Sequence, residues 1–296
     1  MNRVSELFHI VLLSCLCLGC TEAEMGGCDN ASVTLEYSGD GVNDTFRQHI
    51  ANVTYYIYDA SGGRVATGKL ESADLAANRG FRLRLEAGTY QVVCWGNLEH
   101  YCQANHADRR ETARIVNLAH VENADAVNYD PLYYGDATLE VADANEKADI
   151  TLRLHSAHIT LWLYTKGTVL LNPDGTPRPP VFHVGGFLSE FDFYGKGGGI
   201  PMSFTPEAVY KEEKMICMAR CEVPRFTEET PSLLKVYNSA DQQLLEVVEI
   251  AKFIEDNDIQ IKGKEEIEIP IMLDFMGLEV VVRLPSWDEI GAVPEW

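Results

Sequence analysis

Hydrophobic and polar residues alternate along many short segments of this chain, and most of these segments are followed by turn-forming residues. Alternation over about 4–8 residues is typical of half-buried β-strands. In the first half of the chain, the pattern predicts strands at 31–37, 53–58, 65–70, 81–85 and 89–95. In the second half, it predicts strands at 150–154, 157–163, 233–237, 244–250, 265–273 and 278–284. The pattern favours only one short helix, at 251–258, so the sequence predicts an all-β sandwich or barrel.

The length of the chain suits two such domains in series. The 296 residues, less an N-terminal leader, suffice for two domains of about 100–200 residues each, and 46% hydrophobic residues can fill two cores. A polar break at 142–147 precedes a fresh run of strands. We therefore expect one β-sandwich at 31–146 and a second at 147–296. Segments 99–128 and 195–201 lack alternation, and we expect a long loop and a flexible hairpin loop there.

The first twenty residues are typical of an export signal. Arg3 precedes an apolar run at 7–18, which is shorter than the roughly 20 residues that a membrane-spanning helix needs. Gly19 and Cys20 follow this run. A small residue directly before cysteine is typical of bacterial lipoprotein signals, in which the thiol is acylated and becomes the new N-terminus.

We therefore expect a signal peptide at 1–19 and a lipidated tether at 20–30, with the lipid on Cys20. The tether is acidic, contains glycine and has no periodicity, which favours a flexible connection. Two alternatives remain open. The lipid could be attached to Cys15, or the leader could be an ordinary signal peptide that leaves no lipid.

The charge of the chain excludes one large class of functions. The formal net charge is −21, which repels phosphate backbones and anionic lipid headgroups, so we expect no nucleic-acid partner. No apolar run after the leader is long enough to cross a membrane. Any attachment to a membrane would therefore depend on the N-terminal lipid, and stable attachment needs more than one acyl chain.

The cysteines do not form the pattern of a disulfide scaffold. Of eight cysteines, five would remain unmodified after cleavage before Cys20 and acylation of its thiol: Cys28, Cys94, Cys102, Cys217 and Cys221. An odd number at irregular spacing argues against a dense disulfide framework. Cys94 is expected to be a buried thiol, with a disulfide to Cys102 as the alternative. Cys217 and Cys221 are expected to be independent thiols, with a bridge across a turn as the alternative.

No arrangement of residues indicates a metal, a cofactor or catalysis. Four potential metal ligands lie close together in the sequence, but their spacing fits no zinc template: Cys94, His100, Cys102 and His106. His155 and His158 are three residues apart in a predicted strand, which places them on opposite faces. Nucleophile-elbow, zinc-protease and phosphate-loop motifs are absent from the sequence. We expect no enzymatic activity, and a secreted hydrolase is the weakest of the functions considered.

A cluster of aromatic residues stands out at 130–136, with the sequence Asp-Pro-Leu-Tyr-Tyr-Gly-Asp. Tyr133 could fill the end of a sandwich, since Pro131 favours a turn beside it. Alternatively, Tyr133, Tyr134 and Trp95 could form an exposed platform that stacks on a sugar or another ligand. On physical grounds the structural role is favoured.

Several of these features, taken in order, resemble one protein family. A leader that ends in Gly-Cys is followed by an acidic tether with Cys28 and a first strand with Val33, Leu35 and Tyr37. The segments 88–97 (GTYQVVCWGN) and 130–135 (DPLYYG) come later. Together they resemble the fimbrillin-A-associated anchor family, lipoproteins that hold type V pili of Gram-negative bacteria to the outer membrane. The resemblance implies two tandem transthyretin-like β-sandwiches.

The resemblance also implies a mechanism of assembly. Pilus subunits join by strand addition, in which one chain supplies a strand to a groove in the next. In stalk subunits the first strand is removed by proteolysis, whereas an anchor must keep its lipidated strand, here near 31–37. Arg47 follows this strand and is a potential protease site whose cleavage would sever the anchor.

The sequence therefore predicts a non-enzymatic, lipid-anchored protein of the outer membrane, exposed at the cell surface. Its expected partners are the major or accessory subunits of a fimbria, which it anchors or helps to assemble by strand addition. The alternative is a surface lipoprotein that binds glycan or another extracellular ligand.

Overall fold

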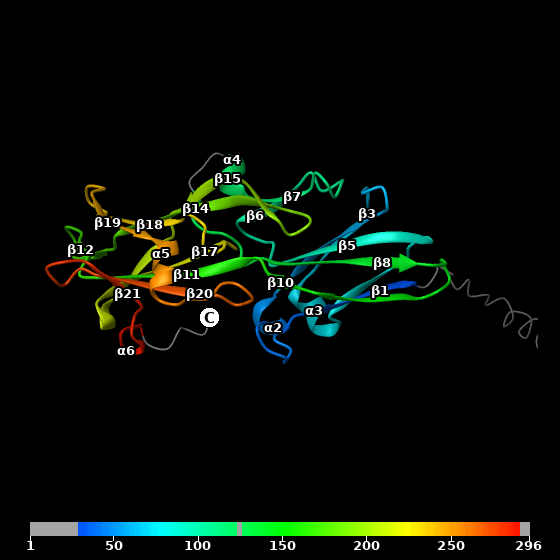
Figure 1. The fold of residues 1–296 in the computed structure, drawn as a ribbon, viewed down its shortest axis with the longest axis horizontal. Coiled ribbons are helices and arrows are strands. Elements are labelled where there is room, and N and C mark those ends of the chain that lie inside the picture. The colour runs from blue at the N-terminus through cyan, green and yellow to red at the C-terminus, as the bar shows by residue number, and fades with distance from the viewer. Residues whose placement is uncertain (1–28, 123–125, 291–296) are drawn as a thin grey trace, which may run out of the picture.

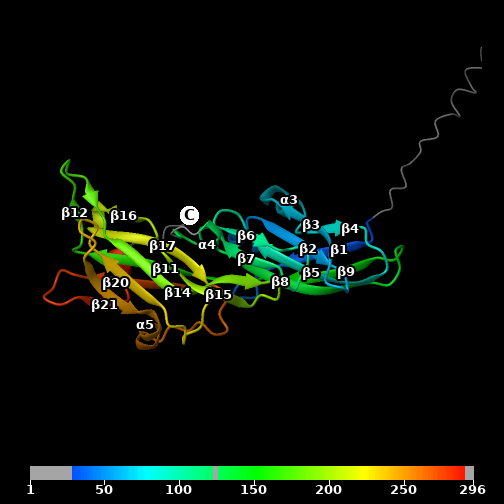
Figure 2. The ribbon, with the colours of Figure 1, turned by 90° about the horizontal axis from the view of Figure 1, so that it is seen from above.

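The computed structural model describes residues 29–122 and 126–290, which form two β-sandwiches arranged end to end (Figures 1 and 2). This arrangement confirms the prediction of an all-β protein with two sandwiches in tandem. The export signal and the greater part of the tether, including Cys15, Cys20 and Cys28, lie outside the described residues.

The first sandwich consists of a small sheet and a larger one. The small sheet has the order β4 (Gly80–Leu83), β1 (Ala31–Glu36), β9 (Ala148–Arg153). The larger sheet has the order β10 (His155–Ser156), β8 (Tyr133–Val141), β5 (Gly88–Gly96), β2 (Val53–Tyr58), β3 (Arg64–Leu70). Strand β1 is the central strand of the small sheet, because it pairs antiparallel with β4 and parallel with β9.

The second sandwich also has two sheets. One sheet has the order β16 (Ala208–Lys211), β17 (Ile216–Pro224), β11 (His158–Lys166), β20 (Glu268–Asp274), β21 (Val281–Arg283). The other has the order β19 (Leu244–Glu249), β18 (Leu233–Tyr237), β14 (Val181–Asp192), β7 (Arg114–Asn117), β6 (Cys102–Asn105), with β15 (Gly197–Phe204) also paired to β14. A short hairpin joins β12 (Leu170–Leu171) and β13 (Pro177–Arg178).

The helices of the described chain are short, and all but the last connect two strands. They are α2 (Phe46–His49), α3 (Ser72–Ala77), α4 (Leu118–Glu122), η2 (Glu212–Lys214), α5 (Ile250–Asp256) and α6 (Trp287–Ile290). Helix α5 confirms the short helix expected at 251–258. Within the described ranges, no helix combines the length and the apolar composition that a membrane crossing requires.

The hydrophobic cores of the two sandwiches meet at the larger sheet of the first one. Alternate residues of β5 point into different cores, with Cys94 in the core of the first sandwich and Trp95 in the core of the second. Phe191 and Phe193 pack against the Trp95 side, with ring centroids 5.9 and 6.2 Å from that of Trp95. Because one sheet contributes to both cores, the sandwiches are joined by packed apolar side chains and not by a flexible linker.

Strand pairing corrects the expected domain boundary between residues 146 and 147. Strand β9, which follows that boundary, pairs with β1 over six residues and so completes the first sandwich. Strands β6 and β7, which precede it, join β14 in the second sandwich. The polar break is only the connection from β8 in the larger sheet to β9 in the small sheet, because such a connection and an interdomain linker have the same polar composition.

Several segments differ from their predicted structure, including β8 and β17, which were not predicted as strands. The segment 99–128 contains two short strands, β6 and β7, where a long loop was predicted. The turn before β15 is short, and the glycines at 197–199 belong to that strand, so the prediction of a flexible loop at 195–201 was wrong. Strand β14 escaped prediction because its alternation shifts at a bulge, where Gly186 adopts a φ of 100°.

Candidate functional site

Asn30 attaches the beginning of β1 to the rest of the first sandwich. Its side-chain amide donates to the carbonyl oxygens of Leu85 (2.9 Å) and Ala144 (3.1 Å), and its Oδ1 accepts the backbone N–H of Leu85 (2.9 Å). Its backbone N–H donates to Leu83, and its carbonyl accepts from Ala148. The tether expected at 20–30 therefore ends before Asn30, which is buried and belongs to the sandwich.

Strand β1 is an integral part of the first core. The side chains of Ala31, Val33, Leu35 and Tyr37 are all buried, whereas Ser32, Thr34 and Glu36 alternate with them on the outer face. Because β1 lies between β4 and β9, its removal would leave an apolar groove with two unpaired edges.

Arg47 lies in helix α2, not in an extended loop. Its guanidinium is exposed and donates to the carbonyl oxygen of Ala76 (2.7 Å). The neighbouring Phe46 and Ile50 are buried in the first core. A protease needs an extended segment, so cleavage at Arg47 requires both apolar side chains to leave the core first.

A hydrogen-bonded cluster joins the two sandwiches where β1 ends. The carboxylate of Glu266, which precedes β20, accepts the hydroxyls of Tyr37 and of Tyr133, the latter at 3.0 Å. The Nδ1 atom of His49 lies 3.3 Å from the same carboxylate oxygen. Burial and the nearby Glu266 raise the pKa of Tyr37 and of Tyr133 far above the usual value, so both hydroxyls stay protonated and remain donors.

The aromatic platform considered for glycan binding is not at the surface. Trp95 is 0% exposed and Tyr133 2% exposed, and neither ring face is open to a ligand. Tyr134 is partly buried, and its hydroxyl donates to the carbonyl oxygen of Phe193 (3.2 Å). The structural interpretation of the segment 130–136 is confirmed.

Asp130 has a structural role of its own in that segment. Its buried carboxylate accepts four successive backbone N–H groups at 3.0–3.2 Å: those of Glu99, His100, Tyr101 and Cys102. These bonds fix the chain between β5 and β6 as it passes into the second sandwich. The sequence marked Asp130 only as part of a motif, because its partners lie about 30 residues away.

The four described cysteines are free and buried: Cys94, Cys102, Cys217 and Cys221. The alternative disulfide between Cys94 and Cys102 is therefore not formed, and these two thiols lie in different cores. Nor do Cys217 and Cys221 form a bridge, because they lie four residues apart on the continuous strand β17. Burial raises the pKa of every one of these thiols, which makes them unreactive.

The side chains of the two histidines in the segment 155–158 lie in different environments. His155 is exposed and bonds to the carboxylate of Glu265 (2.7 Å). His158 is buried, and its Nδ1 lies 3.1 Å from the carbonyl oxygen of Leu132. Over the described residues, no three side chains of the metal-ligating types come together at one place.

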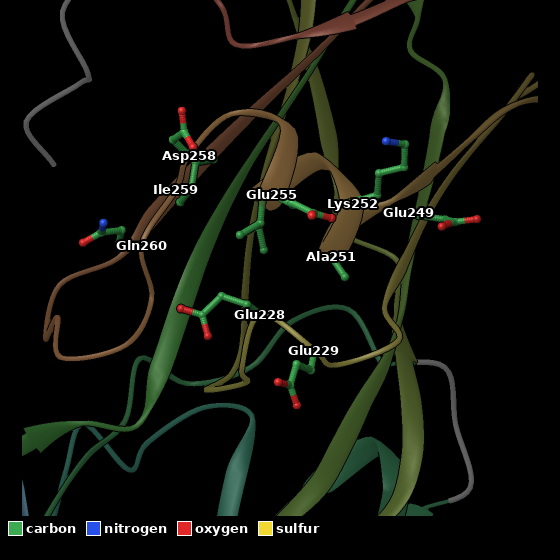
Figure 3. A pocket seen from close by; sticks show the side chains of 10 residues that line it. Glu228, Glu229, Glu249, Ala251, Lys252, Glu255, Asp258, Ile259 and Gln260 are labelled. Carbon is green, nitrogen blue, oxygen red and sulfur yellow. The ribbon is translucent and has the colours of Figure 1, made fainter.

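The surface of the second sandwich carries an acidic hollow of about 720 Å³ beside helix α5 (Figure 3). Five carboxylates line it, from Glu228, Glu229, Glu249, Glu255 and Asp258. Lys252 is the one basic residue in its lining, and it already pairs with Asp256 at 2.8 Å. Strand β19 leads directly into this hollow and has no neighbour on its outer side within the described chain.

Comparison with models of known protein families shows which family the chain belongs to. The family model described as fimbrillin-A associated anchor proteins Mfa1 and Mfa2 matches residues 25–292. The chain belongs to this family of anchor proteins. This match confirms the resemblance inferred from the sequence. Among curated protein sequences, none matches the chain.

Solved structures share the fold of the chain at low sequence identity. A putative adhesin from Bacteroides ovatus has a TM-score of 0.68 and 13% identity, over 88% of this chain and 97% of that one. A putative polysaccharide-binding protein from Bacteroides thetaiotaomicron has a TM-score of 0.65 and 13% identity, over 88% and 99%. The fimbrial anchor protein Mfa2 from Porphyromonas gingivalis has a TM-score of 0.62 and 15% identity, over 85% and 94%.

Proposed function

We propose that the protein is a non-enzymatic lipoprotein of the outer membrane that holds a fimbria at the cell surface. A lipid on Cys20 retains the chain at the membrane, and the second sandwich contacts a fimbrial subunit by strand addition. The observation that carries this proposal is the family match over residues 25–292. The buried, fully paired β1 supports it, because an anchor must keep its first strand attached to its lipid.

The position of β1 suits a protein that is pulled from both ends. Strand β1 begins at the end of the first sandwich that faces away from the second (Figure 1). Its parallel neighbour β9 leads through residues 154–157 into β11 of the second sandwich. A force between the membrane and the fimbria would pull β1 and β9 along their axes in opposite directions. The hydrogen bonds of a parallel pair are evenly spaced, so they would bear this load together and not one after another.

The hydrogen-bonded cluster at Glu266 supports the same role. Tyr37 is the residue that follows β1, and its hydroxyl bonds to Glu266 of the second sandwich. Tyr133 reaches the same carboxylate from β8. The end of the first strand is therefore coupled directly to the domain that would contact the fimbria.

Glycan binding is not proposed, because its platform of Trp95 and Tyr133 is buried. No cluster of metal-ligating side chains among the described residues favours a hydrolase either.

The test of the lipid anchor compares two cysteine variants in the native host. Cys20→Ala should release the protein from the membrane fraction and leave fimbriae in the medium, because the chain then has no lipid. Cys15→Ala is the matched control, because this residue would be removed with the signal peptide. Mass spectrometry of the mature N-terminus should find an acylated cysteine at position 20. Retention of Cys20→Ala in the envelope, or a mature chain that begins beyond Arg47, would refute the proposal.

A further inference from the structure

Strand β19 has a free outer edge that is unusually apolar. It forms one end of its sheet and pairs only with β18 among the strands of the described chain. Its sequence is Leu-Leu-Glu-Val-Val-Glu, and Leu244 and Val247 are 47% and 39% exposed. An apolar strand with an open edge is a template for pairing with another chain.

The other edge strands carry protections that β19 lacks, since β19 has only a bulge at Leu245 and two glutamates. Strand β15 contains three glycines and Pro201, and β3 contains Gly68 with Arg64 and Lys69. Strand β9 contains Arg153, and the remaining edge strands have four residues or fewer. Proline, basic residues and short length are the usual protections of an edge. Among the described strands, β19 is thus the one edge of six residues without glycine, proline or a basic residue.

The backbone of β19 offers its outward groups to a partner. The N–H of Ile250, which follows β19, donates across to Ser232 beside β18. Amides alternate along a strand, so the N–H of Val247 points to the open side. This N–H is satisfied only by the carboxylate of the preceding Glu246 (2.9 Å), a local bond that an incoming carbonyl can replace.

The surroundings of β19 specify the charge of that partner. Its last residue, Glu249, lines the acidic hollow, where Glu228 and Glu229 lie across from helix α5 (Figure 3). One oxygen of Glu228 accepts the backbone N–H groups of Ile261 and Lys262, which fixes its carboxylate in place. A segment that runs along β19 would therefore reach a concentration of negative charge at one end.

We propose that the free edge of β19 receives an extended segment of a fimbrial subunit. The segment alternates apolar and polar residues, and lysine or arginine at one end enters the acidic hollow. Backbone hydrogen bonds to β19 supply affinity, and its apolar side chains extend the row formed by Val247 and Leu244. This proposal rests on the proposed fimbrial function and adds the edge and the chemistry of the partner.

The first experiment locates the contact by amide hydrogen exchange. The probe is the purified polymerising fimbrial subunit from the same genome, mixed with the lipid-free protein. Binding should slow exchange at residues 244–249 and should weaken as salt rises, because the hollow attracts basic residues. Protection at β9 or β3 with no change at β19 would overturn the proposal.

The second experiment uses variants of the edge. Val247→Lys places a positive charge on the edge strand, which repels the lysine or arginine of the partner segment. This substitution should lower the affinity for the fimbrial subunit about tenfold or more. Val65→Lys is the matched control, because Val65 is an exposed valine of the edge strand β3. Val247→Pro removes the outward N–H without breaking a bond to β18 and should have the same effect. Circular dichroism and thermal melting establish that each variant is folded.

The two proposals fail in different ways. If Cys20→Ala sheds fimbriae but a folded Val247→Lys variant still holds them, the anchor function stands and the β19 edge is wrong. If the fimbrial subunit does not bind the wild-type protein at all, the anchor function itself is wrong.

Discussion

The side chain of Asn30 and the backbone of Leu85 are joined by a reciprocal pair of hydrogen bonds. The amide of Asn30 donates to the carbonyl oxygen of Leu85, and Oδ1 accepts its N–H, both at 2.9 Å. This pair imitates one step of a β-ladder just before β1 begins. It holds the chain at the point where the tether would transmit force to the folded protein.

Replacement of Asn30 by alanine should destabilise the protein by about 2 kcal/mol, because the buried N–H of Leu85 and two carbonyl oxygens lose their partner. The measurement is urea unfolding with the slope of the transition compared between variants. Asn43→Ala is the control, since Asn43 is exposed in the loop after β1. An equal effect of both substitutions would show that the bonds of Asn30 carry no special stability.

The same substitution should lower the force needed to unfold the protein, and it should do so more when the force is applied through β1 than in another direction. In single-molecule stretching, one handle is the N-terminus and the other is Asp241→Cys in the exposed β18–β19 turn. Asn30→Ala should then lower the unfolding force, because forced unfolding follows the barrier to unfolding and β1 is loaded along its axis. Pulling from Ala60→Cys in the exposed β2–β3 turn instead leaves β1 and the partners of Asn30 outside the direct path, so Asn30→Ala should have a smaller effect there. If Asn30→Ala lowers the unfolding force equally in the two directions, β1 does not carry the applied force.

The alternation of apolar and polar residues made strand β1 predictable. It did not predict the hydrogen bonds that attach the beginning of the strand to the rest of the sandwich. Val33, Leu35 and Tyr37 alternate with polar residues, and the strand was predicted from this period alone. Asn30 lies in a polar segment for which the sequence predicts a flexible tether. Nothing in the neighbouring sequence indicates that Leu85 is its hydrogen-bond partner.

Long-range contacts and a local bulge explain two further differences between prediction and structure. The bond between Tyr37 and Glu266 joins residues 229 positions apart, so no local period reports it. The bulge at Gly186 shifts the alternation of β14, which hid that strand. The sequence identified the family through ordered motifs, whereas the free edge of β19 became visible only once strand order was known.

Gly80 should tolerate no side chain, because β4 approaches β1 closely there. A Cβ atom at Gly80 would lie 2.0 Å from the carbonyl oxygen of Val33, and φ is 154°. Gly80→Ala should therefore cost more than about 2 kcal/mol of stability. Gly175→Ala is the matched control, because Gly175 also has a positive φ, 83°, but no atom within 4 Å of its Cβ position. Similar losses in urea unfolding would mean that backbone strain, not the β1–β4 contact, sets the cost.

The buried His158 should make the protein less stable in mild acid. Burial lowers the pKa of His158 to about 4 in the folded protein, whereas an unfolded chain binds the proton near pH 6.5. Between these values the unfolded state holds more protons, so stability falls as pH decreases, by up to about 3 kcal/mol near pH 4. Burial raises the pKa of the neighbouring Glu222, whose protonation favours the folded state in acid and so opposes this trend.

A comparison of His158→Gln with the wild type isolates the histidine, because Glu222 is present in both. Between pH 7 and pH 4, the free energy of unfolding should fall less in His158→Gln than in the wild type. His155→Gln is the control, since His155 is exposed and its loss should leave the wild-type slope near pH 5 largely in place. Parallel curves for His158→Gln and the wild type would mean that His158 is protonated in the folded protein as readily as in the unfolded chain.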